Sequence, residues 1–117
     1  MAFQLGKSDI KTITGKVDIF TPQDFGGRSK AGSLKVTVQV LPRSEFLDMT
    51  RMAENDAELV KRLVLDIGAG DSKTEVAPYT EDLVDEIYEI DWQFDPILTF
   101  VLQANSGRIG RALKAKN

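Results

Sequence analysis

The stretch "LVLDIGAGDSKT", residues 63–74, decides the fold, because it joins an amphipathic segment to a run of glycine and polar residues. Upstream, Asn55 followed by Glu58 has the pattern of a capping box at a helix start. Apolar side chains then recur at helical spacing, at Leu59, Val60, Leu63, Val64 and Ile67. We therefore expect a helix from Asn55 to Ile67, with Gly68 in a left-handed conformation just past its end.

The glycine-rich part of this stretch also resembles two cofactor loops. "LDIGAGD" is similar to the loop after the first strand of class I methyltransferases, and "GAGDSKT" is similar to a phosphate-binding loop. Either loop must leave a strand and open a helix, so that free backbone N–H groups face the ligand. Here the approach is helical, Ser72 replaces a required glycine, and no glycine follows Asp71. We therefore favour a helix end and expect no cofactor, with a small enzyme that uses residues 68–74 as an alternative.

Length and composition allow one compact domain over residues 1–117. The chain has no cysteine and no histidine, which removes thiolate nucleophiles, the Ser-His-Asp arrangement and the common zinc sites. We therefore expect no catalytic residue, no metal site and no enzymatic activity. A net charge of -3 argues against a nucleic-acid partner. The sequence shows neither an export signal nor a long apolar run, so we expect a cytosolic protein with no membrane contact.

Alternating residues predict two strands before the helices. Apolar and polar residues alternate from Ile10 to Phe20 and again in "SLKVTVQVL", residues 33–41, so each strand should be covered on one side. The segment "TPQDFGGRSKAGS" between them contains proline and three glycines, which predicts a long, mobile loop. Residues 10–41 should therefore form a β-hairpin. Phe25 in its loop should be exposed and able to fold onto a partner.

Helical periodicity marks the rest of the chain. "RSEFLDMTRMA" has Ser44 as its expected N-cap, and Thr80 should cap "EDLVDEIYEI". A more apolar helix, in "DWQFDPILTFVLQAN", begins at Asp91, or at Asp95 with proline in its first turn. Its apolar residues occupy more than one face, which favours a central helix or one covered by another chain. The predicted fold is therefore α+β, with an N-terminal β-hairpin packed against a bundle of about four α-helices.

The candidate partner-binding residues are aromatic or basic. Trp92 and Phe94 are either core anchors at a helix start or partner-facing residues, because large aromatics are mostly buried but enriched at interfaces. Arg108 and Arg111 belong to a basic tail, residues 106–117, which follows the helical part, residues 43–105. This tail is either a solubilising end or a segment that docks on acidic parts of a client or another subunit. With Phe25, these residues complete the candidate set.

In order, these elements resemble the tail assembly chaperones of long-tailed (siphovirus-type) bacteriophages and prophages. The likeness covers roughly residues 33–105 and includes a strand-to-helix passage, "VTVQVLPRSEFLDM", and a helix, "NDAELVKRLVLDI". A turn-rich insertion, "GAGDSKTEVAPY", and two closing helices, "TEDLVDEIYEI" and "FDPILTFVLQAN", follow. Several members have tryptophan where Ile67 stands here.

The resemblance implies a non-catalytic assembly factor in the host bacterial cytoplasm. Such proteins bind the tape measure protein before the tail tube polymerises and keep its hydrophobic segments from aggregating. We expect apolar strips between helices, with the hairpin loop, to take up amphipathic segments of the client. Further expected partners are a frameshifted longer form of the chain, tail tube subunits and other copies of the chain. A structural tail component, such as a tail terminator or head-to-tail joining protein, is the alternative.

Overall fold

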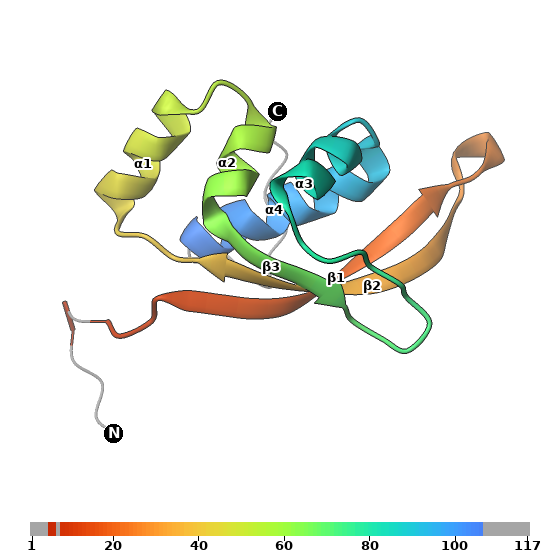
Figure 1. Cartoon of the computed structure of the whole chain (residues 1–117), viewed down its shortest axis with the longest axis horizontal. Coiled ribbons are helices and arrows are strands. Elements are labelled where there is room, and N and C mark those ends of the chain that lie inside the picture. Colours follow the sequence, from red (N-terminus) through yellow and green to blue (C-terminus); the bar gives the residue numbers. More distant parts are fainter. Residues whose placement is uncertain (1–4, 7, 107–117) are drawn as a thin grey trace.

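The computed structural model describes residues 5–6 and 8–106, where four helices lie on one side of a three-stranded antiparallel sheet (Figure 1). The elements are β1 (Thr12–Pro22), a 3-10 turn (Asp24–Gly26), β2 (Arg28–Gln39), α1 (Arg43–Met52), α2 (Asp56–Leu63), β3 (Val64–Ala69), α3 (Glu81–Tyr88) and α4 (Asp91–Ser106). The strand order is β1-β2-β3. In this part of the chain the predicted α+β class, with a hairpin packed against four helices, is confirmed.

The two predicted strands form, and their alternation places one face in the core. The buried residues of this face are Val17, Ile19, Val36 and Val38. On the opposite face, the hydroxyls of Thr14 and Thr37 form a hydrogen bond of 2.9 Å. The helices cover the apolar face only, as Figure 1 shows. The hairpin is therefore apolar toward the helices and polar on its open side.

The loop between these strands is shorter than predicted. β1 continues to Pro22 and β2 begins at Arg28, so only residues 23–27 make the turn, which Gln23 closes by donating its N–H to the Gly27 carbonyl at 2.7 Å. Residues 22–31 are all exposed, so no apolar alternation marks the strands there. In Figure 1 this end of the hairpin projects beyond the helices.

The prediction of a helix that ends at Ile67 is wrong. α2 ends at Leu63, and the next six residues form β3, which pairs antiparallel with β2. The register shifts so that Leu65 stands between paired positions, half exposed, while Val64 and Ile67 are buried. This irregularity puts inward-facing residues three apart, which is also a helical spacing. Gly68 pairs with Lys35 inside the strand and does not cap a helix.

Asn55 and Thr80 cap helices as predicted. The Asn55 side chain accepts the N–H of Glu58 at 2.9 Å, and the Thr80 hydroxyl accepts the N–H of Leu83 at 3.1 Å. The Glu58 carboxylate accepts the N–H of Glu54 at 2.6 Å. The Glu58 side chain therefore makes the reciprocal bond of a capping box, but its partner is the residue before the N-cap and not the N-cap itself.

The first and last helices begin as follows. α1 begins at Arg43 with Pro42 in the N-cap position and no side-chain cap, so the prediction of Ser44 as N-cap is wrong. α4 begins at Asp91, one of the two predicted starts. Pro96 therefore lies inside α4, where it supplies no N–H to the helical hydrogen bonds.

α4 is central to the core. It packs against β1, α2 and α3, and its buried residues are Phe94, Ile97, Phe100, Val101 and Ala104. Near its end, the Asn105 side chain accepts the N–H of Leu41 at 2.9 Å and donates to the Gln39 carbonyl at 3.1 Å. These bonds hold the last turn against the end of β2. The basic tail predicted for residues 106–117 lies outside the described residues, apart from Ser106.

No helix in the described ranges is long and apolar enough to cross a membrane. Residues 43–105, predicted as the helical part, contribute β3 to the sheet as well as the four helices.

Gly15 is needed for the close packing of β1 against α4. A Cβ atom on Gly15 would lie 2.6 Å from the buried Phe100 ring. We expect Gly15→Ala to lower the free energy of unfolding by about 1–3 kcal/mol, because the ring must leave its packed position. Denaturant unfolding followed by circular dichroism measures this change.

Gly68→Ala is the matched control, because a Cβ there meets nothing within 4 Å and the residue also lies in a strand. Its expected effect is within about 0.5 kcal/mol. The double variant Gly15→Ala/Phe100→Leu should lose less than the sum of its single variants. Equal losses at the two glycines would contradict the packing explanation.

Candidate functional site

An apolar groove opens between α3, the start of α4 and the sheet. Its volume is about 250 Å³. The side chains that form most of it are Ile19, Leu34, Val76, Leu83, Ile87 and Trp92. Small-molecule pockets have volumes of about 300 Å³ or more. The groove therefore suits one or two large side chains of a partner better than a nucleotide.

The helical wall of the groove follows from the period of α3. Leu83 and Ile87 are one turn apart, half-buried, and both line the groove. Trp92 is the single tryptophan of the chain and is also half-buried at the groove. Tyr79 holds the connecting segment in place by donating its hydroxyl to the Val64 carbonyl at 3.2 Å. Burial raises the pKa of the Tyr79 phenol, so it remains a donor.

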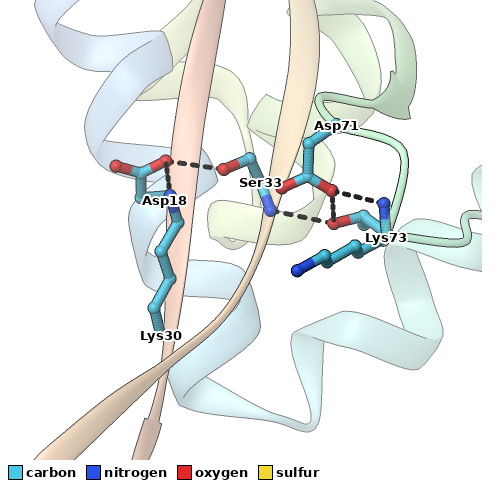
Figure 2. Close-up of polar contacts among 6 residues, drawn as sticks. Asp18, Lys30, Ser33, Asp71 and Lys73 are labelled. Atoms are coloured by element: carbon cyan, nitrogen blue, oxygen red, sulfur yellow. Dashed lines mark hydrogen bonds and ion pairs between the residues drawn. The ribbon is translucent and has the colours of Figure 1, made fainter.

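A series of polar contacts ties the segment after β3 to the hairpin, as Figure 2 shows. Ser33, fully buried, donates its hydroxyl to Asp18 at 2.7 Å and its backbone N–H to the Thr74 hydroxyl at 3.0 Å. The Thr74 hydroxyl donates in turn to the Asp71 carboxylate at 2.7 Å. Asp71 also accepts the N–H of Lys73 at 3.0 Å. We call Asp18, Ser33, Asp71 and Thr74 the polar latch.

The latch stabilises ionised carboxylates. The Ser33 hydrogen bond lowers the pKa of Asp18, and the positive charges of Lys30, 3.5 Å away, and Lys16 act in the same direction. The Thr74 hydrogen bond lowers the pKa of Asp71. Because the Ser33 hydroxyl is bonded to a carboxylate that stays ionised, we interpret the cluster as structural.

The segment from Gly68 to Thr74 does not have the geometry of a nucleotide-binding loop. A strand does lead into it, so the expected helical approach is wrong. However, β3 is an edge strand in antiparallel pairing, and no helix follows before α3 begins at Glu81. Two of its backbone donors are also occupied, because Gly70 donates its N–H to the Ser33 carbonyl at 2.8 Å and Lys73 donates its N–H to Asp71 at 3.0 Å.

The segment from Glu75 to Asp95, which contributes α3 and the start of α4, is acidic. Between Thr74 and Asn105 the sequence has no lysine or arginine. Its acidic residues, all exposed, are Glu75, Glu81, Asp82, Asp85, Glu86, Glu89, Asp91 and Asp95. Asp85 pairs with Lys61 of α2 at 2.7 Å. Of these eight residues only Glu75 lines the groove, while Glu81 and Asp85 line a second pocket against α2 and Asp95 lies beside β1.

The structure separates the predicted partner-binding residues. Trp92 lines the groove, whereas Phe94 is only 3% exposed and packs edge-on against Tyr88, with ring centroids 4.9 Å apart. Phe94 therefore belongs to the core. Arg108 and Arg111 lie outside the described residues.

Phe25 stands at the tip of the projecting hairpin, fully exposed. Its φ of 59° is in the left-handed region, which an aromatic residue rarely adopts. An exposed aromatic in a strained conformation is a candidate contact residue. It lies on a different part of the molecule from the groove lining.

Sequence reasoning missed the residues that make the groove, above all Leu83, Ile87 and Val76. The helical spacing of Leu83, Val84, Ile87 and Tyr88 in "EDLVDEIYEI" predicts a buried stripe, but Leu83 and Ile87 are only half-buried. No periodic pattern surrounds Val76, because it lies in the irregular segment before α3. The sequence marks these residues only as apolar, which does not distinguish a groove from a core.

Among the described residues, no three or more acidic side chains are grouped so as to hold a metal ion. Comparisons with protein-family models, curated proteins and solved structures found no match. Function is therefore inferred from the groove, its charges and the order of the elements.

The polar latch should weaken in acid. The folded-state pKa values of Asp18 and Asp71 are lowered, so their stabilisation is complete above the ordinary carboxyl pKa and is lost as the pH falls through the folded-state value. We expect Ser33→Ala and Thr74→Val to reduce the free energy of unfolding more at about pH 7 than at about pH 2. Urea unfolding at both pH values tests this.

Thr14→Val is the matched control for Thr74→Val, because the Thr14 hydroxyl is exposed and bonds to Thr37 without a carboxylate. Its effect should not depend on pH. A loss for Thr74→Val that is the same at both pH values would show that the carboxylates do not contribute.

Proposed function

We propose that the protein is a non-catalytic tail assembly chaperone of a long-tailed bacteriophage or prophage, which binds the tape measure protein in the host bacterial cytoplasm. The observation that carries the proposal is the apolar groove with Trp92 in its lining. The order of hairpin, strand-to-helix passage, turn-rich insertion and closing helices agrees with it.

The groove suits the recognition of an amphipathic helix. Such a helix presents apolar side chains three or four residues apart, and one or two of them can enter a groove of about 250 Å³. Burying one large apolar side chain contributes about 1.5–3 kcal/mol. Part of this is offset by the ordering of both partners, so a single contact is weak. A chaperone needs such reversible contacts, because the client must be released when the tube forms.

Repetition strengthens weak contacts on a long client. Several chaperones that bind neighbouring segments of one tape measure protein cover it more fully than one contact would. The projecting hairpin with Phe25 adds a second contact surface, at a cost of about 1–3 kcal/mol for the strained φ. In the same proposal, other copies of the chain, a frameshifted longer form and tail tube subunits are further partners.

The decisive experiment is co-expression with the tape measure protein that this proposal expects to be encoded beside the chain. We expect the two proteins to co-purify, and the fluorescence of Trp92 to change when peptides from the tape measure are added. Leu83→Ser should weaken peptide binding about tenfold or more, because it removes an apolar wall of the groove.

Leu47→Ser is the matched control, because Leu47 is a partly exposed leucine on α1 outside the groove lining. It should bind peptides as the unaltered chain does. Failure of the tape measure protein to co-purify, or equal binding by Leu83→Ser, would reject the proposal. A structural tail component would remain in finished particles, so detection of the chain in purified virions by mass spectrometry would favour that alternative.

A further inference from the structure

The outer edge of β1 has no partner strand within the described residues. β1 is the first strand of the order β1-β2-β3 and runs for 11 residues, Thr12–Pro22. The helices cover one face of the sheet and add no strand beside β1 (Figure 1). An unpaired edge presents a row of N–H and C=O groups that can pair with a strand of another chain. Because strands usually have about five or six residues, this edge is long.

β1 lacks most of the features that prevent such pairing. Short edge strands, prolines and bulges usually protect an edge. In β1 the one proline is Pro22, the last residue of the strand. The register shift after Ile19 leaves its extra residue, Ala31, in β2, so β1 itself stays regular.

The middle of β1 is complementary to itself in antiparallel pairing. Val17 is the midpoint of Thr12–Pro22, and the exposed residues Lys16 and Asp18 flank it. If two copies of β1 pair antiparallel about a two-fold axis at Val17, Lys16 of each copy lies opposite Asp18 of the partner subunit. Opposite charges directly across two strands stabilise the pairing, and like charges destabilise it.

The same charges select this register over its neighbours. A slip of two residues places Lys16 opposite its own counterpart in one direction, and Asp18 opposite its own counterpart in the other. The register centred on Val17 also uses the whole strand, because Thr12 then lies opposite Pro22 at both ends.

From this self-complementarity we infer that two copies of the chain pair their β1 strands edge to edge. The two three-stranded sheets then form one continuous antiparallel sheet of six strands. Every second residue pair across β1 would exchange two backbone hydrogen bonds. The contact is isologous, as in most dimers. The pairing needs only this chain and does not rest on the proposed function.

Lys16 gains in the dimer a partner that it lacks in one chain. Within the chain, Lys16 lies directly across from Lys35, a like charge. None of the ion pairs in the described part of the chain includes Lys16. Asp18 accepts the Ser33 hydroxyl at 2.7 Å and lies 3.5 Å from Lys30. Because a carboxylate has about four acceptor sites, Asp18 can also receive the ammonium group of a second copy.

The helical side of this edge is open. A hollow of about 400 Å³ lies between β1 and α4, and its lining includes Lys16, Val17, Asp95 and Thr99. Asp95 and Thr99 are exposed, so α4 does not seal the edge. Lys16 and Asp95 have opposite charge, so the lining carries no net charge that would keep two copies apart. Because Val17 lies on the two-fold axis, the hollows of the two copies meet at the interface.

Charge reversal tests the pairing in the full chain. Sedimentation velocity should show a dimer that increases with protein concentration. Lys16→Glu should raise its dissociation constant about tenfold or more, because both attractive pairs become repulsive. Lys35→Glu is the matched control, because it makes the same change in net charge on the same face, one strand further from the edge. It should dimerise as the unaltered chain does.

A single cysteine tests the register. The chain has no cysteine, so an introduced one reports one contact. Val17→Cys should form a disulfide-linked dimer under mild oxidation, because residues opposite each other in an antiparallel pair have Cα atoms about 4.5–5.5 Å apart. Lys35→Cys is the matched control. Its two copies would be three strand spacings apart, at least about 14 Å, which is too far for a disulfide.

Three results would overturn the inference. These are a monomer at every concentration, equal dimerisation by the Lys16→Glu chain and the unaltered chain, and cross-linking at position 35 without cross-linking at position 17. In the first case Lys16 protects the edge and does not pair it.

One consequence does rest on the proposed function. A dimer carries two grooves, so a long client with several segments binds both at once, and the second contact is made at a high effective concentration. Lys16→Glu should therefore bind a full-length tape measure protein about tenfold or more weakly, but a peptide with one segment equally well. If dimers form and no tape measure protein binds, the proposed function fails and the edge pairing stands. If the full-length client binds both chains equally, two-groove binding is rejected.

Discussion

The antiparallel pairing of β3 with β2 is the contact on which the rest of the structure depends. It turns the chain out of α2 and along the sheet, so that Gly70 reaches the Ser33 carbonyl and Thr74 reaches the Ser33 amide. From there the chain returns to α3, held by the bond from Tyr79 to the first residue of β3. The groove lies between these parts, because residues of the sheet, the returning segment and α3 all line it. Without this pairing, Thr74 and Asp71 would not be held beside Ser33, and the segment after β3 would not line the groove.

The groove combines two properties that act against each other in a small protein. Its lining is apolar, and exposed apolar surface favours association. The exposed acids of α3 and the start of α4 carry like charges, which oppose the association of copies of the chain through this surface. The apolar lining of the groove and the charge on these helices therefore act in opposite directions on association.

Local features of the structure were predictable, and features that depend on distant contacts were not. The caps at Asn55 and Thr80 join groups three residues apart, so the sequence contains all the information they need. The hairpin near the core was predictable because burial on one side imposes alternation. Its projecting end was not, since both faces there meet water and no pattern is imposed. The end of α2 was mistaken because the irregular pairing at Leu65 spaces Val64 and Ile67 as a helix would. Of the candidate site, Trp92 was identified as a candidate, but Leu83 and Ile87 could be recognised only as apolar.

The sequence by itself determined the α+β class, the positions of the helix starts at Asn55 and Thr80, and the separation of acidic and basic charge. These depend on composition, period and short-range hydrogen bonds. Only the tertiary structure decided that residues 64–69 are a strand, and that Phe94 is buried while Trp92 faces a groove. The physical reason is that each of these features depends on which other part of the chain packs against the residues concerned. Hydrogen-bond partners for β3 are supplied by β2, some thirty residues earlier, and an apolar side chain becomes core or groove according to what packs against it.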